Sequence, residues 1–415
     1  MNNKEFKALG VMIFGGSATF GAEKAGYKID RVLEMTDDMH LKNAYHFAQN
    51  RKDIPLVPPS TWENVPHLQN LKKNNYDLLY ANCPCSSLSQ INRNASVDGA
   101  NNVQFYRVFE VIKNVEPKAF IIENAPTFIK LGYPILLDCV EQLTDKYKFT
   151  VIRDHAGSHG VPMKRLRTLL VGWHKDYFNS EIPLLKMKRS PQTTVKDAIG
   201  DLYDKPLGSI PNHDLIPHRG WQEFEHLYHT VKPNSSIMLS IMDMWDEIKD
   251  TVTDTSYINQ ITTAKAKKEK GQNIWDKSPW RSGENDAAPS LTSVTELIHP
   301  IHNRPYTIRE YARLMGYPDD FIFEPEKSET EIIQALAQGV PAPFIEYISS
   351  EIKEAISGNR RMIIGSRHKE LCFQHHSKGK YNTFTMEELK SLVEPNDKGK
   401  VEGLEVDKTF SDLEN

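Results

Sequence analysis

Two of the chain's four cysteines lie on one short turn. Cys83 and Cys85 flank Pro84 directly after the apolar run Asp77–Ala81. A residue just beyond the carboxyl end of a strand lies where open α/β sheets bind ligands. Three roles are open to such a thiol. It can be structural, it can bind zinc, although no second cysteine pair follows nearby, or it can be a nucleophile, which needs activation because a free thiol has a pKa of roughly 8.5.

Charged side chains that could assist a thiolate occur in two further segments. The segment FIIENAP reads as a buried strand that ends in Glu123 and Asn124. In HGVPMKRLRTLLVGW, Arg165 and Arg167 alternate along a strand and therefore share one face. A carboxylate at a strand end can simply cap the next helix, and alternating arginines are usually solvated. Neither segment by itself indicates catalysis.

The order of five segments is more specific than any one of them. The other two are RPYTIREYARLMGYPDDF (304–321) and AQGVPAPF (337–344). In this order the segments resemble the DNA cytosine-C5 methyltransferase family over about residues 8–350. Pro84-Cys85-x-x-x-Ser89 resembles the family's nucleophile loop and Glu123-Asn124-Ala125 its Glu-Asn-Val. Arg165-x-Arg167 resembles part of its Gln-x-Arg-x-Arg.

The resemblance implies a catalytic set of Cys85, Glu123, Asn124, Arg165 and Arg167. Cytosine C5 is a poor nucleophile, but a thiolate that adds to C6 turns C5 into an enamine-like carbon that accepts a methyl group. An acid at N3 stabilises the charge that this addition creates. The family pattern gives these two roles to Cys85 and Glu123, lets Arg165 hold the base O2, and lets Asn124 order the cysteine loop. The target base must be flipped out, and the polar span 86–102 is predicted to close over it.

A glycine turn near the start of the chain predicts the cofactor site. LGVMIFGGSATFG reads as a strand that runs into a turn and opens a helix, and Glu34 ends the next strand, where an acidic residue bonds ribose hydroxyls. In the resembled family this turn binds S-adenosyl-L-methionine. The predicted cofactor-binding residues are Phe14, Gly16, Ser17, Ala18, Thr19, Phe20, Glu34, Met35, Pro84 and Val340.

The chain departs from the family pattern mainly around this cofactor. The Gly-x-Gly-Gly turn is Gly16-Ser17-Ala18-Thr19, and Gly-Pro-Pro-Cys is Asn82-Cys83-Pro84-Cys85. Ala18 and Thr19 carry Cβ atoms where the family pattern has glycine. Because a missing Cβ lets backbone approach a ligand, these two residues predict weaker cofactor binding. Cys83 stands where the family has proline, which favours a local substitution over a catalytic role.

Alternating strand and helix patterns predict an α/β protein with a mostly parallel sheet. The family resemblance implies that this is a Rossmann-like S-adenosylmethionine-dependent methyltransferase fold with a smaller target-recognition domain. The predicted domains are a catalytic domain at 1–180, completed by 310–357, and a target-recognition domain at 181–309. Residues 358–415 are predicted to be a partly disordered extension with little to bury, so truncation after Gly358 is expected to leave a folded core. Strands are predicted at Leu9–Phe14, Arg31–Met35, Asp77–Ala81, Ala119–Ile122 and Thr168–Trp173.

Composition sets the remaining expectations. The 415 residues are 39% apolar and 26% charged. No stretch approaches the roughly 20 apolar residues that span a bilayer, and the start MNNKEFK lacks a signal-peptide core. We therefore expect a cytoplasmic protein with no membrane and no metal. The family resemblance implies a bacterial or phage-infected cell. The net charge of −4 says little, because a nucleic-acid enzyme needs a basic face and not a basic total.

The expected partner is double-stranded DNA, bound by a monomer as in restriction-modification. Lysines and arginines between the arginine strand and Arg304 are candidate phosphate contacts: Lys186, Lys188, Arg189, Lys265, Lys267, Lys268 and Lys270. Two alternatives stay open. One is a tRNA cytosine-C5 methyltransferase, against which the long recognition region argues. The other is a catalytically impaired DNA-binding relative, against which the retained Cys85, Glu123 and Arg165 argue.

Overall fold

The computed structural model describes residues 5–34, 39–58, 65–88, 96–274, 276–292, 296–324, 328–374, 380–392, 394–395 and 401–402. The chain divides into two compact units. The sheet unit comprises Met1–Val161, Arg165–Pro191 and Gln338–Asn415, and the second unit comprises Pro162–Lys164 and Gln192–Ala337. That the second unit selects target bases stays a prediction.

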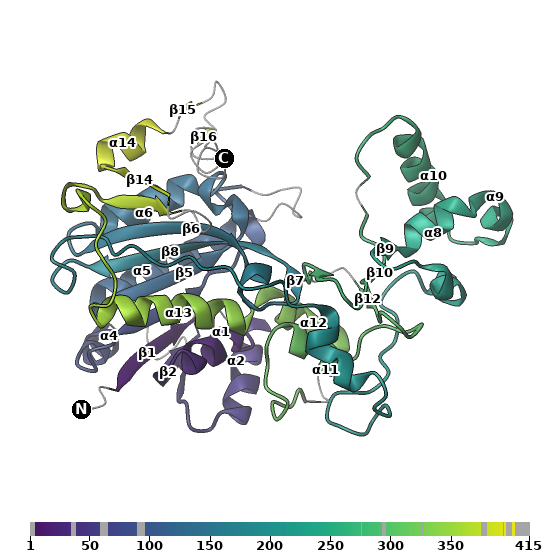
Figure 1. The fold of residues 1–415 in the computed structure, drawn as a ribbon, viewed down its shortest axis with the longest axis horizontal. Helices are drawn as coiled ribbons and strands as arrows, with labels where there is room; N and C mark the ends of the chain where they lie inside the picture. Colours follow the sequence, from purple (N-terminus) through teal and green to yellow (C-terminus); the bar gives the residue numbers. More distant parts are fainter. Residues whose placement is uncertain are drawn as a thin grey trace. The chain divides into compact units, whose positions relative to one another are not determined.

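A nine-stranded sheet forms the centre of the sheet unit (Figure 1), in the order β14-β13-β6-β8-β5-β4-β1-β2-β3. The strands are β1 (Phe6–Val11), β2 (Tyr27–Leu33), β3 (Leu56–Val57), β4 (Leu78–Asn82), β5 (Ala119–Asn124), β6 (Tyr147–His155), β8 (Leu166–His174), β13 (Leu371–Gln374) and β14 (Tyr381–Phe384). The run from β3 to β5 is parallel, and β8 is antiparallel to both β5 and β6. The predicted α/β fold with a mostly parallel sheet is confirmed.

The strand order places a topological switch point between β1 and β4. From β1 the chain proceeds outward to β2 and β3, and then returns to β4 on the other side of β1. Loops at the carboxyl ends of two such strands lead in opposite directions and leave a crevice in which α/β proteins bind ligands. The glycine turn follows β1 and the cysteine turn follows β4, so both predicted sites lie at this edge.

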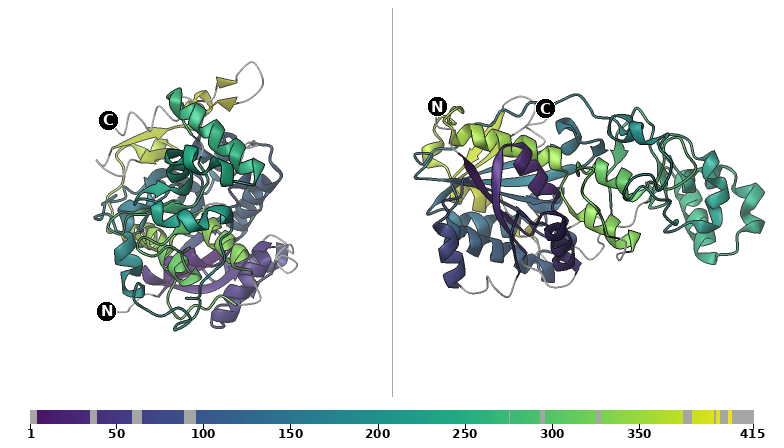
Figure 2. Two further views of the ribbon diagram at one scale, coloured as in Figure 1. Left: turned by 90° about the vertical axis from the view of Figure 1, so that its right-hand side faces the viewer. Right: turned by 90° about the horizontal axis from the view of Figure 1, so that it is seen from below.

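Helices cover both faces of the sheet (Figures 1 and 2). On one face α1 (Ser17–Lys24) packs against α13 (Ala342–Ile356). A Cβ on Gly21 would lie 2.3 Å from the carbonyl oxygen of Ala342, so this close helix contact requires glycine. The other face carries α4 (Val65–Lys72), α5 (Val103–Val115) and α6 (Tyr133–Leu143), whose apolar side chains form the main core with residues of β1, β4 and β5. The helix α2 (Met39–Asn50) follows β2.

The part of the chain after residue 358 corrects one expectation. β13 pairs in parallel with β6, and Leu371 and Phe373 are fully buried in the main core. The helix α14 (Met386–Ser391) adds the buried Leu389, whose carbonyl accepts a hydrogen bond of 2.8 Å from the hydroxyl of Tyr133. The expectation of an appendage with little to bury is therefore wrong for these residues. The average composition of residues 358–415 does not reveal a buried strand of only four residues.

We expect Phe373→Ala to lower the free energy of unfolding of the sheet unit by about 3–5 kcal/mol, the usual cost of truncating a buried phenylalanine. Truncation after Gly358 removes Phe373 together with Leu371 and Leu389, so it should yield insoluble protein or a far lower melting temperature. Ile364→Ala is the matched control, because Ile364 is 92% exposed. Calorimetric melting of the three variants tests this. A truncated protein that melts like the full chain would support the original expectation that the residues after Gly358 bury little.

The second unit is built from short elements. Its helices are α7 (Val195–Ile199), α8 (Ile237–Asp243), α9 (Trp245–Ile248), α10 (Thr255–Glu269), α11 (Ile308–Leu314) and α12 (Glu329–Gln338), the last ending at the unit boundary. Its strands β9 (Ser235–Ser236), β10 (Trp280–Arg281) and β12 (Leu297–Ile298) form one small sheet, and β7 (Met163–Lys164) pairs with β11 (Ala288–Pro289). A separate apolar cluster joins α8, α9 and α10.

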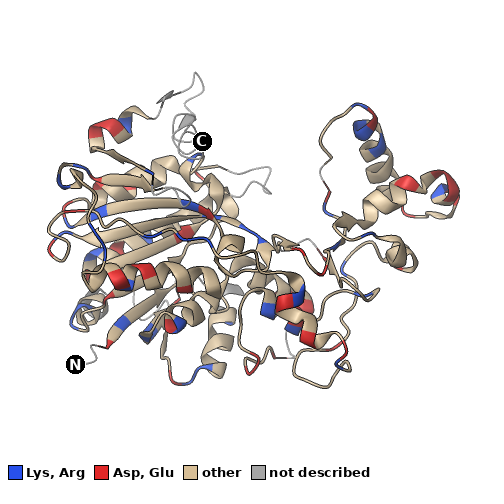
Figure 3. Cartoon of the chain, viewed as in Figure 1, with Lys and Arg blue, Asp and Glu red and all other residues tan. Residues whose placement is uncertain are grey.

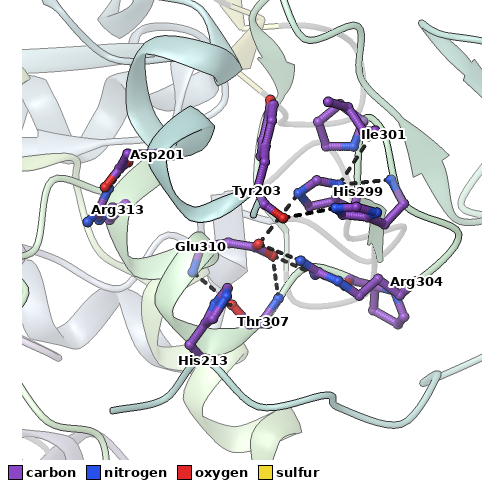
Figure 4. Close-up of polar contacts among 12 residues, drawn as sticks. Asp201, Tyr203, His213, His299, Ile301, Arg304, Thr307, Glu310 and Arg313 are labelled. Atoms are coloured by element: carbon purple, nitrogen blue, oxygen red, sulfur yellow. Dashed lines mark hydrogen bonds and ion pairs between the residues drawn. The ribbon is translucent and has the colours of Figure 1, made fainter. Parts of the chain in front are cut away.

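A buried polar cluster stabilises the start of α11 (Figure 4). Arg304 donates two hydrogen bonds to the carboxylate of Glu310, at 2.9 and 2.8 Å, and Thr307 completes a capping box with the same glutamate. His299 lies 3.5 Å from Glu310. Burial lowers the pKa of His299 to about 2, and the positive charge of Arg304 is the second cause of this shift. The imidazole is therefore neutral. Residues Thr307–Glu310, which lie in the segment 304–321 of the family resemblance, thus have a structural role in this unit.

Candidate active site

The carboxyl ends of β4 and β5 and the start of β8 bring the predicted catalytic residues to one edge. Asn82 of β4 is the register neighbour of Glu123 of β5, and Glu123 in turn pairs with Leu169 of β8. Paired residues on neighbouring strands point to the same face. Arg167 lies two residues before Leu169 and shares that face, so the sheet register brings Arg167 to Glu123.

The two cysteines of the turn differ in their surroundings. Cys83 is 2% exposed and belongs to the main core, where burial raises the pKa of its thiol well above the usual value. Cys85 is only partly buried. The pKa of the Cys85 thiol is raised, chiefly by burial and also by Glu123, while Arg167 and Arg165 oppose the rise. Only Cys85 therefore combines access to a substrate with two arginines that favour its thiolate.

The side chain of Asn124 ties the end of β5 to the cysteine turn. Its Nδ2 donates a hydrogen bond of 3.0 Å to the backbone carbonyl of Cys83. The hydroxyl of Thr127 donates to the carbonyl of Leu88, which fixes the far end of the same turn. Both ends of the cysteine turn are thus held, one by the last residue of β5 and the other by the segment that follows β5. Residues 89–95 of the predicted lid lie outside the described residues.

Glu123 and the two arginines form a buried charged group. The Nε of Arg167 lies 2.8 Å from Oε1 of Glu123, whose side chain is 6% exposed. Burial raises the pKa of Glu123, and Arg167 and Arg165 oppose the rise. Arg165 is 1% exposed and donates a hydrogen bond of 2.7 Å to the carbonyl of Gly339, directly before Val340. A carboxyl whose pKa is raised keeps its proton to higher pH, as an acid that donates to a base nitrogen requires.

A turn leads from β1 into α1 as predicted, but the strand predicted at Leu9–Phe14 ends at Val11, so the turn begins earlier than expected. Gly16 has a φ of 90° and caps α1, and a Cβ there would lie 2.1 Å from the ring of Phe47. Phe14 has a φ of 50°, which is strained for an aromatic residue. Backbone strain of this kind clusters at binding sites, where the surrounding structure holds it in place.

The remaining predicted cofactor residues are buried at this edge: Ser17, Ala18, Thr19, Phe20, Glu34, Pro84 and Val340. Glu34 follows the last residue of β2 and is fully buried. Met35 lies outside the described residues. The hydroxyl of Thr19 lies 2.7 Å from the hydroxyl of Tyr80 on β4. The Thr19 side chain therefore points at the sheet, so its extra atoms do not lie over the strand ends.

Two buried polar atoms at the switch point fit a polar ligand. Among the described residues, neither Ser17 Oγ nor Asn82 Nδ2 has a hydrogen-bond partner, although Ser17 is fully buried and Asn82 is 2% exposed. Unpaired buried polar groups are rare in folded proteins and point to a ligand or to bound water. The sequence analysis missed Asn82 as a site residue. Its signal was the replacement of the family's glycine by a side chain that can form hydrogen bonds.

Comparison with known proteins decides the family. Residues 14–354 match the family model described as C-5 cytosine-specific DNA methylase. The chain belongs to this family. M.DdeI, a type II methyltransferase of Desulfomicrobium norvegicum, is 23% identical over 350 residues, which cover 79% of this chain and 82% of the relative. M.NgoPII of Neisseria gonorrhoeae is 24% identical over 354 residues, covering 82% and 93%.

A solved structure supports the fold of this family member. It is described as a candidate DNA modification methyltransferase encoded within a prophage of E. coli. It has a TM-score of 0.58 and 20% identity, and the match covers 85% of this chain and all of the other. The family match ends at residue 354, so β13 and β14, which extend the sheet, and the helix α14 lie beyond the matched residues.

The charges of the second unit bear on the phosphate contacts predicted for its lysines. Lysines of α10 lie among carboxylates (Figure 3). Lys268 lies 3.5 Å from Asp243, and Lys265 lies 3.9 Å from Asp246. These two predicted phosphate contacts thus have acidic partners within the unit, which favours the reading of α10 as a solvated face. Within the described residues, no helix combines the length and apolarity needed to cross a bilayer.

We expect Glu34→Ala to weaken binding of S-adenosyl-L-methionine about tenfold or more, because a hydrogen bond to a charged group contributes about 1.5–3 kcal/mol. Calorimetric titration of the full chain measures this. Glu110→Ala is the control, because Glu110 is an exposed glutamate of α5 on the other face of the sheet. Equal affinity of Glu34→Ala and wild type would remove Glu34 from the cofactor site.

Proposed function

We propose that this chain is a DNA cytosine-C5 methyltransferase that methylates C5 of a flipped-out cytosine through a covalent bond between Cys85 and C6. One observation carries the proposal. A partly exposed thiol lies within electrostatic reach of a buried glutamic acid and two arginines, at the carboxyl edge beside the switch point. S-adenosyl-L-methionine, when bound at the turn after β1, supplies the methyl group.

Each residue of the group has a defined part in this reaction. The Cys85 thiolate forms a bond to C6, and the electrons of the C5–C6 double bond shift toward N3, where Glu123 donates a proton. The electrons return to C5 as the methyl group is transferred. A base then removes the C5 proton, the C5–C6 double bond reforms as the thiolate leaves, and N3 returns its proton to Glu123. Arg165 and Arg167 stabilise the thiolate and hold the base O2, and Asn124 fixes the turn that carries Cys85.

The wider assignment follows from the relatives. The curated relatives are type II methyltransferases, which supports double-stranded DNA as the partner and a role in restriction-modification. In our proposal the chain acts as a monomer on DNA in the cytoplasm of a bacterial or phage-infected cell. The same relatives favour DNA over tRNA as the substrate.

Transfer of a labelled methyl group in vitro tests the proposal. Purified full-length chain should transfer label from S-adenosyl-L-methionine to duplex DNA that contains all short sequence contexts, and not to bulk tRNA. Label on tRNA alone would favour the tRNA alternative. DNA binding without any transfer would favour a catalytically impaired family member.

A further inference from the structure

Asn82 ends β4 at the edge where the catalytic residues and the glycine turn meet. Its side chain is buried, and its Nδ2 has no hydrogen-bond partner within the part of the chain that the structure describes. Leaving a buried amide donor unpaired costs about 1–3 kcal/mol. The family pattern has glycine at this position. The chain thus carries a costly polar group where the pattern needs none, which indicates that the group binds a ligand.

Strand geometry shows which way the Asn82 side chain points. Tyr80 lies two residues earlier on β4 and therefore projects to the same face. The hydroxyl of Tyr80 contacts Thr19 of α1, so this is the face that α1 covers. Cys83, which directly follows Asn82, lies in the core on the opposite face. Asn82 therefore faces α1 and lies beside its register neighbour Glu123.

The contact between Thr19 and Tyr80 also relates Asn82 to Ser17. β1 and β2 are parallel, so α1, which connects them, runs back against the strands. Ser17 lies two residues before Thr19, which places it about 3 Å closer to the start of α1. Asn82 lies two residues after Tyr80, which places it about 7 Å closer to the carboxyl end of β4. Both steps lead to the same edge of the sheet, and Ser17 Oγ is likewise buried and unpaired in the described chain.

This edge favours a negatively charged group. The first backbone N–H groups of a helix have no partner within the helix, and the helix dipole adds partial positive charge there. The Asn82 amide nitrogen is a donor only, so it requires an acceptor. S-adenosyl-L-methionine carries one anionic acceptor, the α-carboxylate of its methionine part.

We propose that Asn82 binds the α-carboxylate of the methyl donor through its side-chain amide, together with the Ser17 hydroxyl and the first turn of α1. The inference rests on the proposed function. It assigns a cofactor-binding residue specific to this chain, at a position where the family pattern has no side chain. The Asn82 contact also offsets the glycine loss at Ala18, because it supplies a hydrogen bond from β4 that does not depend on close approach of the turn's backbone.

Calorimetric titration with two thioether analogues of the cofactor tests the assignment. S-adenosylhomocysteine retains the amino-acid part, and 5′-methylthioadenosine lacks it. Asn82→Ala should weaken binding of S-adenosylhomocysteine about tenfold or more. Asn82→Asp should weaken it further, because the carboxylate of the new residue repels the ligand carboxylate. Binding of 5′-methylthioadenosine should change less than twofold in either variant.

Controls separate this inference from misfolding and from the proposed function. Asn114→Asp alters an asparagine of α5 on the other face of the sheet and should leave both affinities unchanged, and the melting temperatures of all variants verify folding. Equal binding of S-adenosylhomocysteine by wild type and Asn82→Ala overturns the inference. Tighter binding by Asn82→Asp also overturns it, because Asn82 would then accept from the ligand's amino group. A wild-type chain that binds neither ligand contradicts the proposed function instead.

Discussion

Cys85→Ala should abolish the denaturant-stable adduct that wild-type protein forms with DNA carrying 5-fluorocytosine in the presence of S-adenosyl-L-methionine. The last step of the proposed reaction removes a proton from C5, and fluorine cannot leave as a cation, so the bond between Cys85 and C6 persists. Denaturing electrophoresis separates the adduct from free protein. Because the reaction has no other nucleophile, the expected loss is complete.

Cys83→Ala is the matched control for this experiment. It removes a thiol two residues away that lies in the core, where burial and Glu123 raise its pKa. The adduct should survive. Replacement of a small buried side chain should cost only modest stability, which melting would record. An adduct that survives Cys85→Ala and disappears with Cys83→Ala would reverse the assignment of the two cysteines.

Glu123→Gln should slow methyl transfer by about 10²–10⁴-fold, the usual contribution of a positioned acid. The amide keeps the shape of the side chain and can still contact N3, but it cannot donate the proton that neutralises the charge created by thiolate addition. Single-turnover kinetics on the target DNA would measure the rate. A rate within a few-fold of wild type would exclude Glu123 as the acid.

The pH dependence of stability provides an independent check on Glu123. Burial raises the pKa of this carboxyl above that in the unfolded chain, so the folded state binds the proton more tightly. The stabilisation from this group is complete below the unfolded pKa and is lost as pH rises through the folded pKa. Glu123→Gln should therefore remove a decline in stability with rising pH. A mutant with the same pH profile of melting temperature as wild type would contradict the raised pKa.

Local sequence patterns predicted the strands that carry the site. The predicted strands at 77–81, 119–122 and 168–173 correspond to β4, β5 and β8, because each is an apolar run bounded by turn residues. Residue spacing also indicated that Arg165 and Arg167 share a face. The ion pair between Arg167 and Glu123 depends on the antiparallel pairing of β8 with β5, which spacing within one segment cannot specify.

Other features depend on distant contacts and were not predictable from local pattern. β13 is recognisable only through its pairing with β6, more than 200 residues earlier in sequence, as the register of Leu371 with Phe149 shows. The direction of the Thr19 side chain depends on Tyr80 of β4. Asn82 was visible as a departure from the family pattern. Its burial, and the lack of a hydrogen-bond partner for its Nδ2 among the described residues, support the proposal that it contacts a ligand.

Nucleoside mass spectrometry of DNA from cells that express the protein tests the central claim most directly. The same cells expressing Cys85→Ala at equal soluble level provide the baseline. DNA from cells with the wild-type protein should contain 5-methylcytosine above that baseline, with no other modified nucleoside increased. Equal 5-methylcytosine in the two samples, from a host whose genome contains every short sequence context, would contradict the assignment of this chain as a DNA cytosine-C5 methyltransferase.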